Sequence, residues 1–228
     1  MPEVKDKIKS ALRHLTIFRD FFEFRAVYGE CTNFRKFLTY RWHPQFKNNI
    51  YWPVSPRSEV RGRVLLGKGA RAAHRPGCVV QGRGAVFIGD YVEMGPNSVI
   101  ISGNHGLLDH NDVVRKETII GDYCWIASNA VILAGVVLGP RTIVGAGSVV
   151  TKSFPQGYCV IAGNPARVIN ELPHDRFVKD HHEVEYYGYI RADRFKKFKD
   201  THLSHITFAY DLSKVTENKI FWNKIKND

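Results

Sequence analysis

Aliphatic residues recur at every sixth position through the middle of this chain. From residue 120 it reads IGDYCW, IASNAV, ILAGVV, LGPRTI and VGAGSV, and one unbroken register holds Ile120, Ile126, Ile132, Leu138, Val144 and Val150. A helix would scatter these positions around its circumference, and an alternating strand does not require an aliphatic residue at each sixth position. A triangular coil of about three six-residue faces per turn explains the spacing, because stacked turns bury the repeated residue in one core. The period therefore predicts a mainly β fold, a parallel β-helix, over an ordinary β-sandwich with Gly-rich turns.

Other positions of the repeat fit a triangular coil. Gly121, Gly139 and Gly145 directly follow the aliphatic residue, and we attribute them to the positive φ angles of sharp turns. The residue two positions before the aliphatic is small or β-branched, which suits a crowded inward-facing position. These residues are Ala130, Val136, Thr142 and Ser148.

The earlier part of the chain continues the period with interruptions. Leu66, Ala72 and Cys78 share one register, and Ile88, Met94 and Ile100 share another that is out of phase with it. We expect an irregular turn or short insertion around residues 81–84. The polar stretch SGNHGLLDHNDVVRKET, at about residues 102–118, cannot form a coil face and is expected to be an irregular, protruding loop.

Both ends of the chain lack the repeat, which predicts three regions. Residues 1–50 form an N-terminal extension with an amphipathic helix over residues 4–22, which docks on the coil or on a membrane surface. Residues 51–170 form the β-helix. Residues 171–228 form a basic, aromatic-rich extension, helical in part, whose aromatic and cationic side chains could recognise an extended or acidic glycan.

The formal net charge of +11 favours an anionic partner, such as a phosphorylated cofactor, an acidic sugar or an anionic membrane surface. Nucleic acid is the least supported partner, because the basic residues are spread and form no nucleic-acid-binding motif. The four cysteines lie far apart without CxxC spacing, so we expect reduced, mostly buried thiols. The N-terminus is charged from its third residue, which lacks the pattern of a secretory signal and favours a cytoplasmic location.

Three stretches, IGDYCWIASNAVILAGV, IVGAGSVVTKSFP and VIAGNPARVI, resemble in order the signatures of the hexapeptide-repeat acyltransferases. Within that family they are similar to the galactoside, maltose and capsular or exopolysaccharide O-acetyltransferases. The resemblance implies a left-handed β-helix that moves an acetyl group from acetyl-coenzyme A to a sugar hydroxyl, on a capsular polysaccharide, an exopolysaccharide or a precursor. It also implies a homotrimer with its sites in clefts between neighbouring coils.

Acyl transfer from a thioester to an alcohol requires a general base, a proton for the leaving thiol and stabilisation of an oxyanion. The resemblance places the catalytic histidine at His105, within the loop sequence SGNHGLLDH. Asp109 and His110 follow in that loop, where they orient His105, contact the acceptor or are simply solvated. Asn104 and Asn97 are candidate acceptor-binding residues, although both can equally be turn residues.

The remaining site residues also follow from the resemblance. The backbone N–H of Ser128 would stabilise the oxyanion, and Trp125 would shape the cleft or pack at an interface. Coenzyme A needs backbone partners for its pantetheine arm and positive charge for its phosphates. Ala146 would offer backbone to that arm, with Thr151 and Lys152 beyond it. Arg167 would face the phosphates.

Three other functions remain open at this point. A γ-type carbonic anhydrase on the same fold binds zinc through three histidines, and His74, His105 and His110 are candidates, but two of them fall in the loop rather than on rigid faces. We expect no metal, and a structural role for His74. A sugar N-acetyltransferase would use an amine acceptor, and a non-catalytic assembly platform would not bind coenzyme A.

Overall fold

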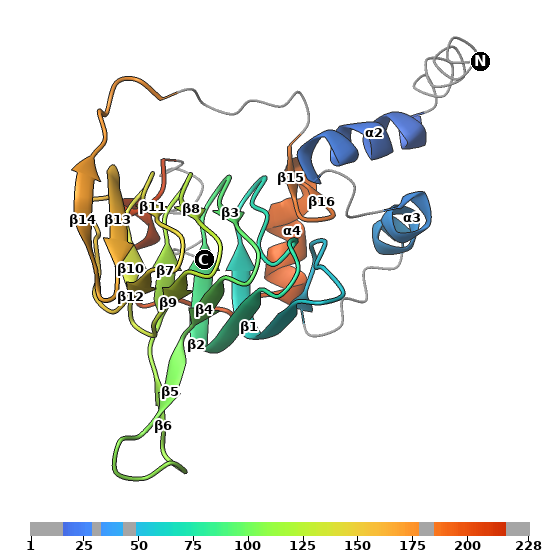
Figure 1. Cartoon of the computed structure of the whole chain (residues 1–228). Helices are drawn as coiled ribbons and strands as arrows, with labels where there is room; N and C mark the ends of the chain where they lie inside the picture. Colours follow the sequence, from blue (N-terminus) through green and yellow to red (C-terminus); the bar gives the residue numbers. More distant parts are fainter. Residues whose placement is uncertain (1–15, 29–32, 43–48, 178–184, 218–228) are drawn as a thin grey trace.

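The computed structural model describes residues 16–28, 33–42, 49–177 and 185–217, and the rest of the chain is drawn in grey in Figure 1. Its centre is the parallel β-helix that the period predicts, left-handed as the resemblance implies, with a hairpin projecting from it and helices beside it (Figure 1). None of the helices in these described ranges is long and apolar enough to cross a membrane.

The coil has three faces, each a ladder of short parallel strands. The first face contains the C-terminal halves of β1 (Glu59–Leu66) and β2 (Val79–Ile88), then β7 (Thr118–Ile120) and β10 (Val137–Leu138). The second face contains β3 (Glu93–Met94), β8 (Trp125–Ile126), β11 (Ile143–Val144) and β13 (Cys159–Gly163). The third face contains the N-terminal halves of β1 and β2, then β4 (Val99–Ile101), β9 (Val131–Ile132) and β12 (Val149–Val150). β14 (Ala166–Glu171) folds back antiparallel on β13 at the end of the coil.

The strand register confirms three hexapeptides per turn. Leu138 pairs with Ile120, Val144 with Ile126, and Val150 with Ile132. All six of these side chains are fully buried. Burying one such side chain contributes on the order of 1.5–3 kcal/mol, so the repeated position supplies the core of the fold.

The glycines after the aliphatic residues have a different cause from the one predicted. Gly121 and Gly139 do not have positive φ; a Cβ on Gly139 would lie 2.3 Å from the carbonyl oxygen of Pro155 in the next coil. Positive φ falls two residues later, at Tyr123 and Arg141, with φ near 57°. These glycines therefore permit close stacking of coils, and the turn itself is made by other residues.

The early coils contain the predicted insertion. Gly62 pairs with Gly82, but Val64 pairs with Val86, so β2 has two extra residues between these pairs. The assignment of Cys78 to the aliphatic register is wrong, because Val80 pairs with Ile100. The corner after Ala72 is longer than predicted, and buried Cys78 takes the small-residue position two places before the aliphatic. Cys78, Cys124 and Cys159 are buried free thiols, as predicted; Cys31 lies outside the described residues.

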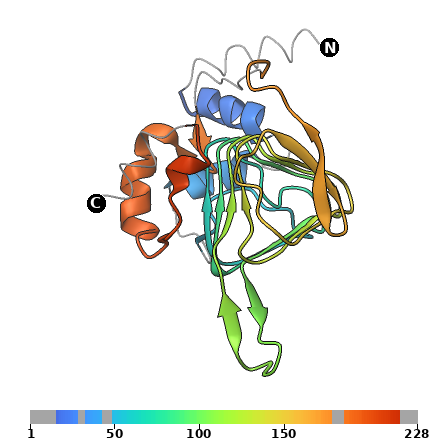
Figure 2. The same ribbon diagram turned by 90° about the vertical axis from the view of Figure 1, so that its left-hand side faces the viewer.

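The loop at about residues 102–118 protrudes as predicted, but it is not irregular. β5 (Gly103–His105) and β6 (Val113–Arg115) form an antiparallel hairpin, which we call the arm. The arm leaves the coil from the edge between the third and first faces, and Figure 2 shows it extending well beyond the coil. At its tip, Leu107 and Leu108 are almost completely exposed.

The N-terminal helices pack on a C-terminal hairpin. α2 (Thr16–Tyr28) and α3 (Phe34–Trp42) contact the hairpin of β15 (Tyr186–Tyr187) and β16 (Ile190–Arg191). Phe24 of α2 stacks on Tyr189, with ring centroids 5.1 Å apart. The helix predicted over residues 4–22 is therefore present from residue 16 and continues to Tyr28, while residues 4–15 lie outside the described part.

The C-terminal segment covers the first face of the coil. α4 (Ala192–His202) and the 3-10 turn η3 (Leu212–Lys214) lie in this segment, and the Glu117 carboxylate accepts hydrogen bonds from the N–H groups of Ala209 and Tyr210. Phe87, which points outward from the first face, is fully buried and contacts Phe208. Tyr186, Tyr187 and Phe195 are buried as well, so these C-terminal aromatic rings pack inside the protein and are not open to a glycan.

Candidate active site

Two hollows lie on different edges of the coil. The first, of about 550 Å³, lies between the base of the arm and the third-to-first edge, and contains His105 and His110. The second, of about 760 Å³, lies where the second face turns into the third, and contains Trp125, Ser128 and Ala146. The third face separates these two edges, so one chain does not bring His105 and Ser128 into one hollow.

His105 ends β5 and is held in one orientation by the arm. Its Nδ1 lies 2.6 Å from the carbonyl oxygen of His110, and this acceptor requires the proton to be on Nδ1. Nε2 is then the unprotonated nitrogen, and in the exposed hollow it accepts a long hydrogen bond of 3.5 Å from Nη1 of Arg83. The arrangement is that of a general base with a fixed tautomer.

Asp109, His110 and Asn104 are placed differently relative to His105. The Asp109 carboxylate accepts the N–H of Asn111 at 2.8 Å and so stabilises the turn of the arm; it does not contact His105. His110 acts on His105 through its main-chain carbonyl, while its ring lines the hollow. Asn104 is exposed on β5, opposite Val114.

The second hollow contains backbone donors that are open to a ligand. Within the described part of the chain, the N–H groups of Ser128 and Ala146 have no acceptor. Gly95 packs beside Ser128, and a Cβ at Gly95 would lie 2.6 Å from the Ser128 nitrogen, so glycine permits close stacking of the two coils at this corner. Trp125 points outward from the second face with 53% of its surface exposed.

The other predicted residues lie apart from these donors. Thr151 and Lys152 are exposed on the third-to-first edge, and Lys152 Nζ lies 5.6 Å from the Phe154 ring centroid. Arg167 is exposed on β14 at the end of the second face. Asn97 is exposed with a φ of 59°, which is the turn role that the sequence left open.

His74 lies away from the arm. It is buried, and its Nδ1 is 2.9 Å from the carbonyl oxygen of Arg71; burial lowers the pKa of its ring. Among the residues that the structure describes, no three His, Cys, Asp or Glu side chains are grouped to hold a metal ion.

Three arginines of the first hollow were missed by sequence reasoning. Arg63, Arg83 and Arg115 line it together with His105. Arg83 lies in the insertion of β2, and Arg63 lies opposite it on the paired strand β1. Arg115 lies on β6 of the arm. The slip in the hexapeptide register was the available signal, because an insertion in a regular coil displaces side chains at that edge.

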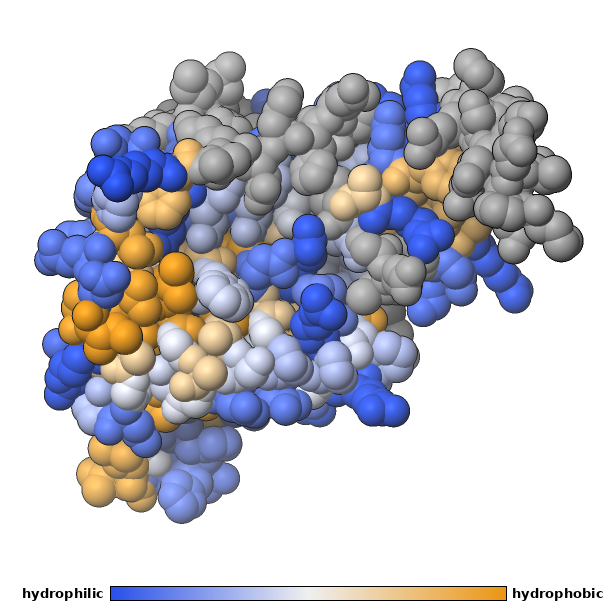
Figure 3. Space-filling view, turned by 45° about the horizontal axis from the view of Figure 1, so that its top comes forward, coloured by the Kyte–Doolittle hydropathy of each residue, from blue (hydrophilic) through white to orange (hydrophobic). Residues whose placement is uncertain are grey.

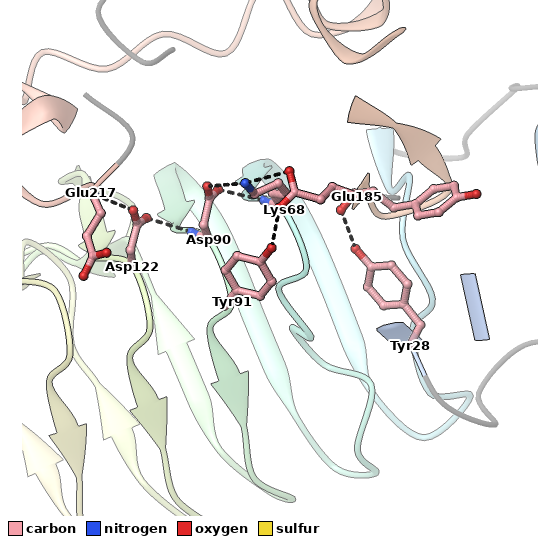
Figure 4. A network of polar contacts seen from close by, with 8 residues as sticks. Tyr28, Lys68, Asp90, Tyr91, Asp122, Glu185 and Glu217 are labelled. Carbon is pink, nitrogen blue, oxygen red and sulfur yellow. Dashed lines mark hydrogen bonds and ion pairs between the residues drawn. The ribbon is translucent and has the colours of Figure 1, made fainter. Parts of the chain in front are cut away.

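A buried polar network follows the edge between the first and second faces (Figure 4). Asp90 accepts the Lys68 N–H, Asp122 accepts the Asp90 N–H, and both of these distances are 2.8 Å. The second oxygen of Asp122 accepts the Glu217 N–H at 2.6 Å, which attaches the C-terminal segment to the coil. Burial raises the pKa of both the Asp90 and Asp122 carboxyls, and their mutual repulsion adds to the effect at Asp122. This network is a structural anchor outside both hollows.

Comparisons with known proteins agree on the repeat. Residues 117–152 match the family model described as bacterial transferase hexapeptide (six repeats). The chain is 40% identical over 91 residues to the galactoside O-acetyltransferase of Escherichia coli, covering 38% of this chain and 44% of the relative. It is 36% identical over 89 residues to a putative colanic acid biosynthesis acetyltransferase of Escherichia coli, covering 39% and 48%. The chain thus spans about half the length of these curated relatives.

Solved structures show the same coil. A galactoside acetyltransferase in complex with coenzyme A superposes with a TM-score of 0.50 and 30% identity, covering 58% of this chain and 69% of the other. A hexapeptide-repeat acetyltransferase from Vibrio cholerae, complexed with acetyl-coenzyme A, superposes with a TM-score of 0.53, covering 72% and 88%. At 22% identity, the latter likeness shows the fold alone.

Proposed function

We propose that this chain belongs to the family whose bacterial transferase hexapeptide model its residues 117–152 match, and that it is an acetyltransferase that moves acetyl from acetyl-coenzyme A to a sugar hydroxyl. The observation that carries the proposal is His105, with Nδ1 hydrogen-bonded to the His110 carbonyl and the unprotonated Nε2 facing a hollow beside Arg83. The relatives named galactoside O-acetyltransferase and colanic acid biosynthesis acetyltransferase support a sugar acceptor and a role in polysaccharide or precursor modification.

In the proposed reaction, Nε2 of His105 removes the proton of the acceptor hydroxyl while the oxygen attacks the thioester carbonyl. The O–H bond breaks, the new C–O bond forms, and negative charge develops on the former carbonyl oxygen. The open Ser128 N–H is suited to that oxyanion, since a preorganised donor needs no rearrangement when charge develops. The C–S bond then breaks, and the proton on His105 passes to the leaving thiolate.

His105 and Ser128 lie on different edges, so we propose that the site forms between copies in a homotrimer. The third face joins the two edges, and one outward row on it contains the exposed Glu59 in the first coil followed by four partly exposed valines, Val79, Val99, Val131 and Val149. If the third face of each copy points toward a threefold axis, the arm edge of one copy meets the Ser128 edge of the next. Figure 3 shows further apolar surface near the β14 side, where Val168 and Ile169 are exposed, and at the end of the arm. Exposed apolar patches of this kind support a partner surface.

Coenzyme A is the proposed donor ligand. Its pantetheine arm would contact the open Ala146 N–H in the second hollow, and Thr151, Lys152 and Arg167 would contribute polar and cationic groups nearby in the assembled trimer. The exposed Trp125 would shape this cleft. We propose a cytoplasmic location, where the donor is available, and no metal takes part in the steps above.

The first experiment is thiol release from acetyl-coenzyme A over a panel of sugars, comparing the wild type with His105→Ala. We expect kcat/KM to fall by about 10²–10⁴-fold, the usual contribution of a positioned general base, with coenzyme A binding retained by calorimetry. His202→Ala is the matched control, because His202 is an exposed histidine at the end of α4 and lines neither hollow. Equal kcat in His105→Ala and the wild type would disprove the proposed base.

A further inference from the structure

The hollow around His105 has an unusual charge composition. Arg63, Arg83 and Arg115 line it together with His105, and its lining contains no carboxylate. In the described ranges, none of these three guanidinium groups forms an ion pair, whereas Arg61, on β1 with Arg63, forms an ion pair with Glu59. Three cations without counter-ions around a reactive base favour an anionic ligand.

The backbone of the β2 insertion next to these arginines is strained, and hydrogen bonds to Ser102 hold it in place. The insertion in β2 leaves buried Ala85 at a φ of 107°, a conformation that costs on the order of 1–3 kcal/mol for a residue with a side chain. Ser102 Oγ, at the base of the arm, accepts the N–H groups of Gly84 and Ala85 at 2.9 and 3.2 Å. The coil is therefore interrupted at the position where the arm begins.

The insertion directs two guanidinium groups toward the arm. Arg63 Nη2 donates to the Gly84 carbonyl at 3.1 Å, which fixes its head beside the insertion. The Arg83 side chain lies over Gly103, since a Cβ on that glycine would be 2.9 Å from Arg83 Cβ. From there Arg83 Nη1 reaches to 3.5 Å from Nε2 of His105.

We propose that the acceptor carries a carboxylate or phosphate next to its reacting hydroxyl, and that Arg83 and Arg115 bind this anion. The inference rests on the proposed function, which it narrows from a sugar to an anionic sugar. Because Arg83 and Nε2 are so close, the anion and the hydroxyl must be neighbours on the acceptor. Guanidinium forks suit both anions, because they donate two parallel hydrogen bonds.

The anion also has a role in the reaction itself. When His105 takes the hydroxyl proton, its imidazolium forms beside the positively charged Arg83, which is unfavourable. An acceptor anion between the two cations offsets that repulsion. A neutral sugar lacks this compensation, so both binding and the rate of acetyl transfer should be lower for it.

The test compares three acceptors that share the glucose ring and differ in charge: methyl glucoside, methyl glucuronide and glucose 6-phosphate. Thiol release is the readout. We expect kcat/KM at least 10-fold higher for one or both anionic acceptors, and the better anion identifies a carboxylate or a phosphate source. Arg83→Gln and Arg115→Gln should lower kcat/KM for the preferred anion by 10–100-fold without changing KM for acetyl-coenzyme A. For methyl glucoside, Arg83→Gln should raise kcat/KM, because it removes the cation that opposes formation of the His105 imidazolium. Arg61→Gln, whose guanidinium is paired with Glu59, should match the wild type.

Calorimetry of the same ligands with the coenzyme A-loaded protein measures anion binding without turnover. Binding of glucuronide or phosphate ester that is lost in Arg83→Gln supports the inference even where the ring is a poor acceptor. Preference for the neutral sugar, or an Arg83→Gln defect confined to acetyl-coenzyme A, would overturn it. If the wild-type protein does not bind coenzyme A, the proposed function itself is wrong.

Discussion

At the residue scale, Ser128 offers a way to remove a single backbone donor without altering the fold. In the preceding coil Pro96 occupies the equivalent position, because Met94 pairs with Ile126. The backbone at this corner therefore accommodates proline, which has no N–H. We expect Ser128→Pro to fold normally and to lower kcat by about 10²–10³-fold, as for loss of an oxyanion donor, while Ser128→Ala retains activity. Thiol release with saturating acetyl-coenzyme A measures both.

Mixing two inactive variants provides the control for this prediction. In a trimer with sites between copies, refolding His105→Ala with Ser128→Pro produces some interfaces that keep both the wild-type histidine and the wild-type N–H. Activity should then reappear in the mixture. If Ser128→Pro is fully active, the oxyanion role is wrong; if mixing restores nothing, His105 and Ser128 do not act across an interface.

From the sequence, roles could be proposed only for residues that a motif contains. The stretch SGNHGLLDH led to His105, and the structure gives that side chain an orientation suited to a base. Arg83 carries no such signal, since a surface arginine is ordinarily solvated and its position depends on a two-residue insertion. Asp109 was predicted to orient His105, to contact the acceptor or to be solvated; its carboxylate is exposed and accepts the N–H of Asn111 in the turn of the arm.

At the element scale, the coil depends on two separate requirements at its corners. Gly139 lacks room for a Cβ, whereas Gly147 has positive φ and open space around it. We expect Gly139→Ala to lower the free energy of unfolding by about 2–4 kcal/mol, because the clash is with backbone. Gly147→Asn should be nearly neutral, because Asn tolerates this conformation and occupies the equivalent corner at Asn97 and Asn129. Urea unfolding compares the two, and equal losses would show that coil spacing adapts to a side chain.

The elements differ in how much of them could be predicted. Each hexapeptide specifies its own face and corner, so the period alone predicts the coil and its core from Ile120 to Val150. The C-terminal segment has no period, and its position depends on contacts with distant residues, such as Glu117 with the N–H of Ala209. The hydrophobic pattern does not specify such pairings. It does contain one sign that the first face is covered, because the consecutive aliphatic residues Ile119 and Ile120 point to opposite sides of that face and both are buried.

At the scale of the whole molecule, the Asp90–Asp122 network couples pH to the attachment of the C-terminal segment. Both carboxyls have pKa values raised above their ordinary 3.8 by burial, so the folded state binds protons more tightly than the unfolded chain. Their contribution to stability is full below about pH 4 and is lost as pH rises through the raised pKa values, with a slope of at most about 1.4 kcal/mol per pH unit for one group.

Asp122→Asn removes one of these titrating groups, so the fall in unfolding free energy between about pH 5 and pH 9 should be shallower than in the wild type. Asp109→Asn, at an exposed carboxylate of the arm, should keep the wild-type slope. Urea unfolding across this range measures the slopes, and hydrogen exchange at the Glu217 amide, which donates to Asp122, reports the local attachment. A protection factor of the Glu217 amide, corrected for the intrinsic exchange rate, that falls with pH in the wild type before global stability does would place the loss at this edge. Identical slopes in Asp122→Asn and the wild type would show that the pair does not control stability.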